Sequence, residues 1–136
     1  EYGRNFLALA HAEASLCGGD LVGALARTRG VEAATRASGE HNHGYALVAL
    51  GAALALANPG DVDGALAEFD TAATFAETRG MVPLQARVCH ARVRMFDAAG
   101  RTAEAARERG AADELCQKLG VAAAAFSVSW SSPPAG

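Results

Sequence analysis

Glycine recurs along this 136-residue chain in two interleaved series, with intervals of 41 and then 40 residues. The first series comprises Gly19, Gly60 and Gly100, and the second comprises Gly39, Gly80 and Gly120. The first series lies in segments that resemble one another: GGDLVGAL at 18–25, PGDVDGAL at 59–66 and, more weakly, AGRTAEAA at 99–106. A repeat of about 40 residues with two loops per unit predicts that similar units stack along the chain.

The segments between these glycines have the composition of helices. Alanine, the strongest helix former, occupies 34 positions, and proline is absent from the interior of each segment. We expect six helices, at residues 3–17, 20–38, 43–57, 61–79, 83–98 and 101–119. Because short loops join consecutive helices, neighbours along the chain should pair antiparallel. The predicted fold is therefore all-α, a stack of three antiparallel helix hairpins.

Residues at the predicted helix ends fit this division. Asp20 and Asp61 stand where a carboxylate can accept backbone N–H bonds at a helix start, whereas Arg101 offers no such group. Pro83 suits the first turn of a helix, where the missing N–H has no partner in any case. The glycines of the second series suit the left-handed residues that end helices.

The composition limits the classes of function. The net charge is −3 and the estimated isoelectric point is about 5.8, so a nucleic-acid-binding protein is not expected. No signal peptide opens the chain, and no apolar run reaches the roughly 18 residues that span a bilayer. Cys17, Cys89 and Cys116 are an odd number inside apolar patterns, which indicates reduced thiols. We expect a cytoplasmic protein that contacts neither nucleic acid nor membrane.

The predicted helix at 43–57 has two apolar sides. One side carries Tyr45, Val48, Ala52 and Leu56, and the other carries Leu47, Leu50 and Leu54. We expect the first side to pack against the partner helix and the neighbouring hairpins, which leaves the leucine side without an assigned neighbour.

The segment G-D-[LV]-x-G-A-L, at 19–25 and 60–66, is followed in its second copy by Phe69 and Ala72. In these features the chain resembles tetratricopeptide (TPR) repeats over most of residues 5–120. The units are longer than the usual 34 residues, and in this they look like the arrays of the MalT-like, large LuxR-type bacterial transcriptional regulators. The resemblance implies a right-handed TPR-like α-solenoid that acts as a sensor or partner-docking module beside an ATPase and a DNA-binding domain.

In such a solenoid the first helix of each hairpin lines a concave surface. Counting back from each loop glycine, the resemblance places the following residues on it: Phe6, Leu9, Glu13 and Leu16; Leu47, Leu50, Leu54 and Asn58; Arg87, His90, Arg94 and Asp97. We hypothesise that the leucines form a floor for an amphipathic or extended peptide and that Arg87, His90 and Arg94 hold a carboxylate. The alternative is that the leucines are core and the arginines a solvated face.

Other functions stay open at this point. A small-molecule receptor would place an amphiphilic acid in a cavity lined by Phe6 and the leucines at 47, 50 and 54, with arginines at one end. A helical enzyme is a further alternative, although no catalytic motif supports it, and no cofactor is expected. The chain starts at Glu1 rather than Met, which suggests a fragment of a longer polypeptide, and both a monomer and a homodimer are compatible with it.

We assign residues 1–120 to one repeat domain, with units at about 3–39, 43–80 and 83–120, and residues 121–136 to a capping segment or tail. The tail alternates Phe126, Val128 and Trp130 with serine before two prolines, and is a candidate occupant of the groove.

Two short motifs invite a chemical interpretation that we reject. EHNH at 40–43 brings Glu40, His41 and His43 together, but this is an incomplete metal-ligand set in a predicted loop. Cys89 and His90 are adjacent on a predicted helix, so their side chains point about 100° apart and do not form a thiol–base pair. We therefore predict no metal site and no catalytic residue.

Overall fold

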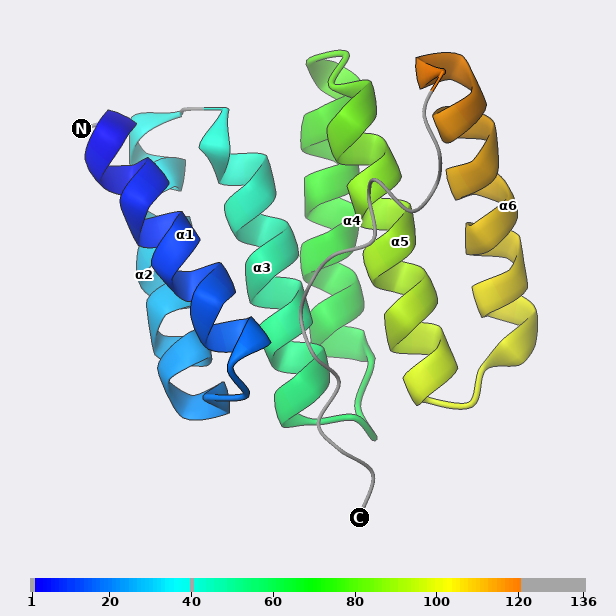
Figure 1. Cartoon of the computed structure of the whole chain (residues 1–136), viewed down its shortest axis with the longest axis horizontal. Coiled ribbons are helices and arrows are strands. Elements are labelled where there is room, and N and C mark those ends of the chain that lie inside the picture. The colour runs from blue at the N-terminus through cyan, green and yellow to red at the C-terminus, as the bar shows by residue number, and fades with distance from the viewer. Residues whose placement is uncertain (1, 40, 121–136) are drawn as a thin grey trace.

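The computed structural model describes residues 2–39 and 41–120, without the side chains of residues 2, 3 and 6 (Figure 1). These residues form six α-helices and no strand: α1 (Tyr2–Cys17), α2 (Leu21–Ser38), α3 (Asn42–Ala57), α4 (Asp63–Thr78), α5 (Val82–Ala98) and α6 (Thr102–Leu119). The all-α prediction is confirmed, and no helix boundary differs by more than two residues from its predicted place. The predicted tail at 121–136 lies outside the described residues.

The helices lie in two rows. Each helix packs against the next one along the chain, and α1, α3 and α5 also contact one another in that order. Among the described helices, α2, α4 and α6 make no contact with each other. We call α1, α3 and α5 the first row and α2, α4 and α6 the second row. In Figure 1 α1 passes in front of α2, and the α1–α2, α3–α4 and α5–α6 connections share one end of the molecule.

The helix ends follow local chemistry. The carboxylate of Asp20 accepts the N–H of Gly23 at 3.0 Å and so caps α2, as predicted. Asp61 instead accepts the N–H of Asp63, the first residue of α4, and stands two positions before it. Gly39, Gly80 and Gly120 have φ between 64° and 68°, which confirms that they end helices in the left-handed conformation.

The core includes residues of all six helices, and α3 is its centre. Ten residues of α3 are buried, from Asn42 to Ala53, and both predicted apolar sides contribute to the core. Alanines in the second row let the rows approach closely: Ala24, Ala65 and Ala105 are at most 1% exposed. Phe69 of α4 is fully buried against α3, where a Cβ on Gly51 would lie 2.5 Å from its ring. Gly51 is therefore the gap that admits this aromatic ring.

Candidate functional site

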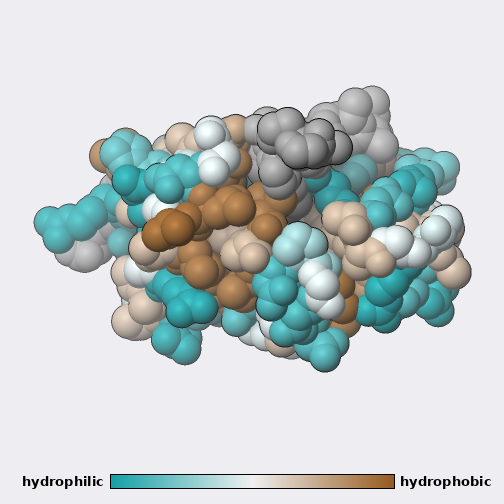
Figure 2. Space-filling model, turned by 90° about the horizontal axis from the view of Figure 1, so that it is seen from below, coloured by the Kyte–Doolittle hydropathy of each residue, from teal (hydrophilic) through white to brown (hydrophobic). Residues whose placement is uncertain are grey.

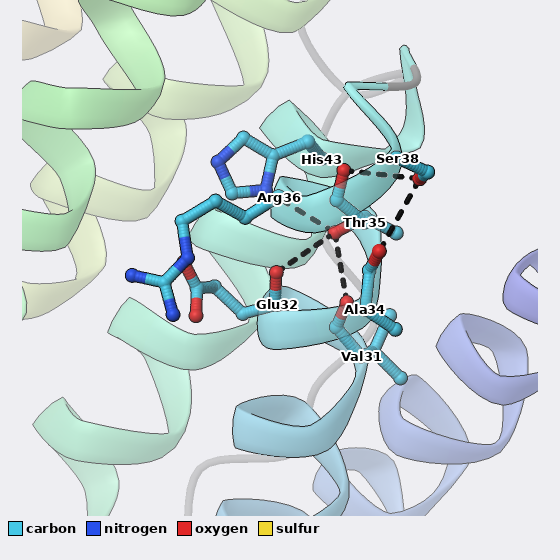
Figure 3. A network of polar contacts seen from close by, with 7 residues as sticks. All are labelled: Val31, Glu32, Ala34, Thr35, Arg36, Ser38 and His43. Carbon is cyan, nitrogen blue, oxygen red and sulfur yellow. Dashed lines mark hydrogen bonds and ion pairs between the residues drawn. The ribbon is translucent and has the colours of Figure 1, made fainter.

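One side of α3 faces the second row. Nδ1 of His43 lies 3.2 Å from Oγ1 of Thr35 in α2 (Figure 3). The His43 ring meets Phe75 of α4 edge to face, with the ring centres 5.5 Å apart. Residues 4, 7 and 11 positions further along a helix share the side of the first residue. This side therefore includes Leu47, Leu50 and Leu54.

The opposite side of α3 faces the inner surface between α1 and α5. The Arg87 guanidinium of α5 lies 5.2 Å from the centre of the Tyr45 ring and 3.5 Å from the Glu13 carboxylate of α1. Glu13 and Arg87 thus form an ion pair that crosses in front of α3. Counting helical turns from Tyr45, we define the inner side of α3 as Tyr45, Ala49, Ala52 and Leu56.

The predicted assignment of the two sides of α3 was therefore wrong. Leu47 is 1% exposed and Leu50 is 6% exposed, so neither is part of an open groove floor. The physical reason is the connection after α3, which has five residues, 58–62, where the other two hairpins have three, 18–20 and 99–101. One of the two extra residues precedes Gly60, so a count back from the loop glycine shifts by one residue, which turns the helix by about 100°.

The inner surface has a recess between α3 and α5 that we call the α3–α5 pocket. Its volume is about 50 Å³. It is lined by Ala52, Ala55, Leu56, Asn58, Pro59, Asp61, Val62, Phe69, Ala91, Arg94, Met95 and Ala98. Two predicted site residues, Asn58 and Arg94, meet here, and Asp61 adds a carboxylate to a lining that is otherwise mostly apolar. A recess of this size accommodates a small side chain or a few waters.

The other predicted site residues divide between core and surface. Leu9 and Leu16 are 7% and 2% exposed and belong to the core, which corrects their predicted place on the groove. Leu54 is half-buried and packs against that core. Asp97 is exposed and binds Arg109 of α6 at 2.9 Å. The side chain of Phe6 lies outside the described part of the structure, so its predicted contact stays a prediction.

Burial shifts the pKa values of two predicted site residues, Glu13 and His90. Desolvation raises the pKa of Glu13, and the positive charge of Arg87 opposes this shift. Desolvation lowers the pKa of His90. The carboxylate of Asp113 in α6 opposes that shift, so a charge on α6 also affects the titration of His90. The predicted trio of Arg87, His90 and Arg94 is therefore not one cluster: Arg87 already binds Glu13, and Arg94 lines the α3–α5 pocket.

Hydrophobic residues also gather on the end of the molecule seen in Figure 2. They cover the half below α1, α2 and α3, where α1 and α3 end and α2 and α4 begin. Val22, in the first turn of α2, is 85% exposed, and Leu21, Leu54, Leu56 and Val62 are half-buried in these helix ends. Leu56 and Val62 continue this surface into the α3–α5 pocket.

A charged furrow between α4 and α6 has no counterpart in the sequence analysis. Arg92 of α5 lies at its base, only 16% exposed, and binds Asp70 of α4 and, at 3.8 Å, Glu108 of α6. Two open recesses of about 360 and 370 Å³ flank this arginine. No motif marks Arg92, because its pairing with a residue 22 positions earlier depends on how α4 packs on α5.

The structure explains the two rejected motifs, EHNH at 40–43 and Cys89–His90, by exposure and packing. His41 is exposed and His43 contacts Thr35, while Glu40 lies outside the described residues. Burial, reinforced by Glu108, raises the pKa of the Cys89 thiol to about 11, which makes it a poor nucleophile at neutral pH. In residues 2–39 and 41–120 no three metal-ligating side chains come together, and none of these helices is long and apolar enough to cross a bilayer.

Comparison of the chain with protein-family models, with curated proteins and with solved structures gives no match. The resemblance to TPR arrays and to MalT-like regulators therefore stays a prediction that rests on the residues quoted above.

Proposed function

We propose that this chain is a right-handed TPR-like α-solenoid of three hairpins that binds a protein or peptide along its inner surface. The order of helix contacts supports this, since each hairpin packs on the next and the first-row helices line one side. The cytoplasmic location, and a role as the sensor or docking module of a larger bacterial transcriptional regulator, belong to the same proposal and rest on the sequence resemblance.

One observation carries the binding proposal: Arg94 and Asn58 line a mostly apolar pocket that also contains Asp61, and Arg94 lies two helical turns from Arg87. A helix rises about 10 Å over these two turns, a distance that an extended peptide of three or four residues covers. An apolar side chain of the partner would enter the α3–α5 pocket, and its carboxylates would bind the arginines. Glu13 already provides one such carboxylate to Arg87, at 3.5 Å.

The small-molecule alternative receives less support. It required the leucines of α3 and the arginines of α5 to line one cavity, but Leu47 and Leu50 are buried on the opposite side of α3. The α3–α5 pocket, at about 50 Å³, is also well below the roughly 300–1,000 Å³ of typical ligand sites. We retain peptide or protein binding as the proposed function.

A peptide-display selection on the intact chain tests the proposal. We expect enriched 12-residue peptides to carry a carboxylate three or four residues from an apolar side chain. Fluorescence anisotropy should then show that Arg94→Glu weakens these peptides at least about tenfold, because it reverses the charge that meets the carboxylate. Arg107→Glu, on exposed α6, is the matched control and should bind normally. Equal affinity of both variants would remove the inner surface from consideration.

A further inference from the structure

The first and third hairpins turn in the same way, which allows their residues to be compared one by one. In α1–α2, Gly19 N donates to Leu16 O and Asp20 N to Ser15 O. In α5–α6, Gly100 N donates to Asp97 O and Arg101 N to Phe96 O, 81 residues later in each case. The glycines have φ of 79° and 75°. A residue of α1 therefore corresponds to the residue 81 positions later in α5.

One face of α5 is covered by the preceding hairpin. Val88, Ala91 and Met95 on this face are 1%, 0% and 4% exposed. Ala91 and Met95 share a pocket with Phe69 of α4, and Arg92 between them binds Asp70 of the same helix. The second-row helix α4 is thus the element that seals this face of α5.

The corresponding face of α1 is open. Subtracting 81 from the four residues of α5 gives Leu7, Ala10, His11 and Ala14, which we call the α1 end face. Leu7 is 64% exposed, whereas Val88 at the equivalent place is a core residue, and Ala10, His11 and Ala14 are exposed as well. A leucine with two alanines one turn apart leaves a shallow apolar strip into which a second helix packs closely.

The other end of the stack does not offer the matching surface. Ala65, Ala72 and Ala76 of α4 correspond to buried Ala105, Ala112 and Cys116 of α6, an interval of 40 residues. The same interval puts Arg109 in the place of Phe69, and Arg109 is 55% exposed and bound to Asp97. A second copy stacked head to tail would therefore bring a charged side chain to Ala10 and Ala14, whose counterparts Ala91 and Met95 share a pocket with the aromatic ring of α4.

We propose that the α1 end face docks an amphipathic helix of a partner protein in the way that α4 docks on α5. The recognising chemistry is that of α4: one large apolar residue in the place of Phe69, with small residues one turn to either side. The α1 end face continues the interface that joins consecutive hairpins inside the chain, so the same packing geometry applies. This proposal does not depend on the inner surface or on Arg94.

A peptide with the sequence of residues 61–80 is the probe, since this segment contains the helix that covers the equivalent face. Short helices are marginal in water, so Ala67→Glu and Thr71→Lys, both exposed in α4, are joined as a side-chain lactam in the peptide. We expect saturable binding of the fluorescein-labelled peptide to the intact chain, and loss of binding when the peptide carries Phe69→Asp.

Leu7→Asp in the protein should weaken this peptide at least about tenfold, because a buried leucine contact is lost. Val22→Asp is the matched control: Val22 is also an exposed apolar residue, at 85%, but lies outside the α1 end face. Arg94→Glu should bind the peptide normally, which separates this site from the inner surface. No saturable binding, or equal binding by Leu7→Asp, would overturn the proposal.

Sedimentation of the unliganded chain completes the test. A monomer that Leu7→Asp leaves unchanged agrees with a partner helix as the occupant. A dimer that Leu7→Asp converts to a monomer would identify a second copy on this face and would overturn the proposal of a foreign helix.

Discussion

The second and third helix pairs, α3–α4 and α5–α6, contact each other through α4 and α5 and through α3 and α5, yet they use their surfaces differently. In the second hairpin, α3 is buried on nearly every side and Phe69 of α4 fills the gap left by Gly51. In the third, α5 carries three arginines, and Arg109 of α6 turns outward to Asp97 in place of an aromatic. The α3–α4 pair therefore contributes mainly buried side chains to the core. The α5–α6 pair presents charged side chains to its neighbours and to solvent.

The difference shows how a loop controls the rotation of a helix. The α3–α4 connection has two more residues than the α5–α6 connection, and α3 presents Tyr45 to the inner surface where an equal count from the loop glycine selects Leu47. Equal spacing along the sequence thus does not place equal faces in space. Four experiments test this contrast.

The largest effect is expected from removing the aromatic ring that α4 packs against α3. Phe69→Ala should lower the free energy of unfolding by about 3–5 kcal/mol, because Phe69 is fully buried and a cavity remains. Arg109→Ala, at the corresponding place in α6, should change it by less than about 1 kcal/mol, since this exposed ion pair is screened by solvent. Urea denaturation followed by circular dichroism measures both. Similar losses in the two variants would contradict the division into core and surface units.

The glycine that admits the ring gives the next effect. Gly51→Ala places a Cβ 2.5 Å from the Phe69 ring and should destabilise the protein by about 1–3 kcal/mol through overpacking. Gly64→Ala is the control within the same hairpin, because a Cβ there meets nothing within 4 Å. It should stabilise α4 by up to about 1 kcal/mol. Thermal unfolding should separate the variants in opposite directions from the parent chain, and a stabilising Gly51→Ala would refute the close packing.

A smaller effect is expected from the ion pair across the inner surface. Glu13 and Arg87 are 40% and 33% exposed, so a double-mutant cycle with Glu13→Gln and Arg87→Gln should give a coupling of about 0.2–1 kcal/mol. The coupling should fall as salt is raised, since exposed charges are screened. A coupling of zero at low salt would mean that α1 and α5 do not meet in front of Tyr45.

The smallest effect concerns pH and the outer side of α3. Desolvation lowers the pKa of His43 from 6.5, Glu32 opposes the shift, and Arg36 and Arg79 reinforce it. The unfolded chain then binds a proton more readily than the folded chain, so the free energy of unfolding should fall as pH drops through 6.5 towards the lowered pKa.

Unfolding measured at about pH 7.5 and about pH 5.5 tests this, because the interval spans the ordinary titration of histidine. His43→Gln should reduce the pH dependence, whereas His41→Gln, at an exposed position, should leave it unchanged. Burial also raises the pKa of Glu13 and Glu68, and a raised carboxylate pKa has the opposite sign, since it stabilises the fold as the pH falls. An unchanged slope in His43→Gln would exclude the proposed burial of this ring.

Local signals in the sequence predicted the helices well. Pro83, Asp20 and the second glycine series mark helix ends through contacts with residues close in sequence, and the structure keeps them there. The structure brings together only some of the predicted site residues. Asn58 and Arg94 meet at one pocket, and Glu13 meets Arg87, but Leu9, Leu47 and Leu50 belong to the core. Leucine is apolar on either side of a helix, so its spacing alone does not distinguish a groove from a core.

By itself, the sequence determined that six helices form and where they begin and end, because propensity, capping and glycine act over one helical turn. Only the tertiary structure decided which side of α3 faces inward and which acids Arg92 binds. It also decided that Leu7 stays exposed while Val88 is buried. These outcomes depend on how each helix is rotated against neighbours distant in sequence, and two residues in a loop are enough to change that rotation.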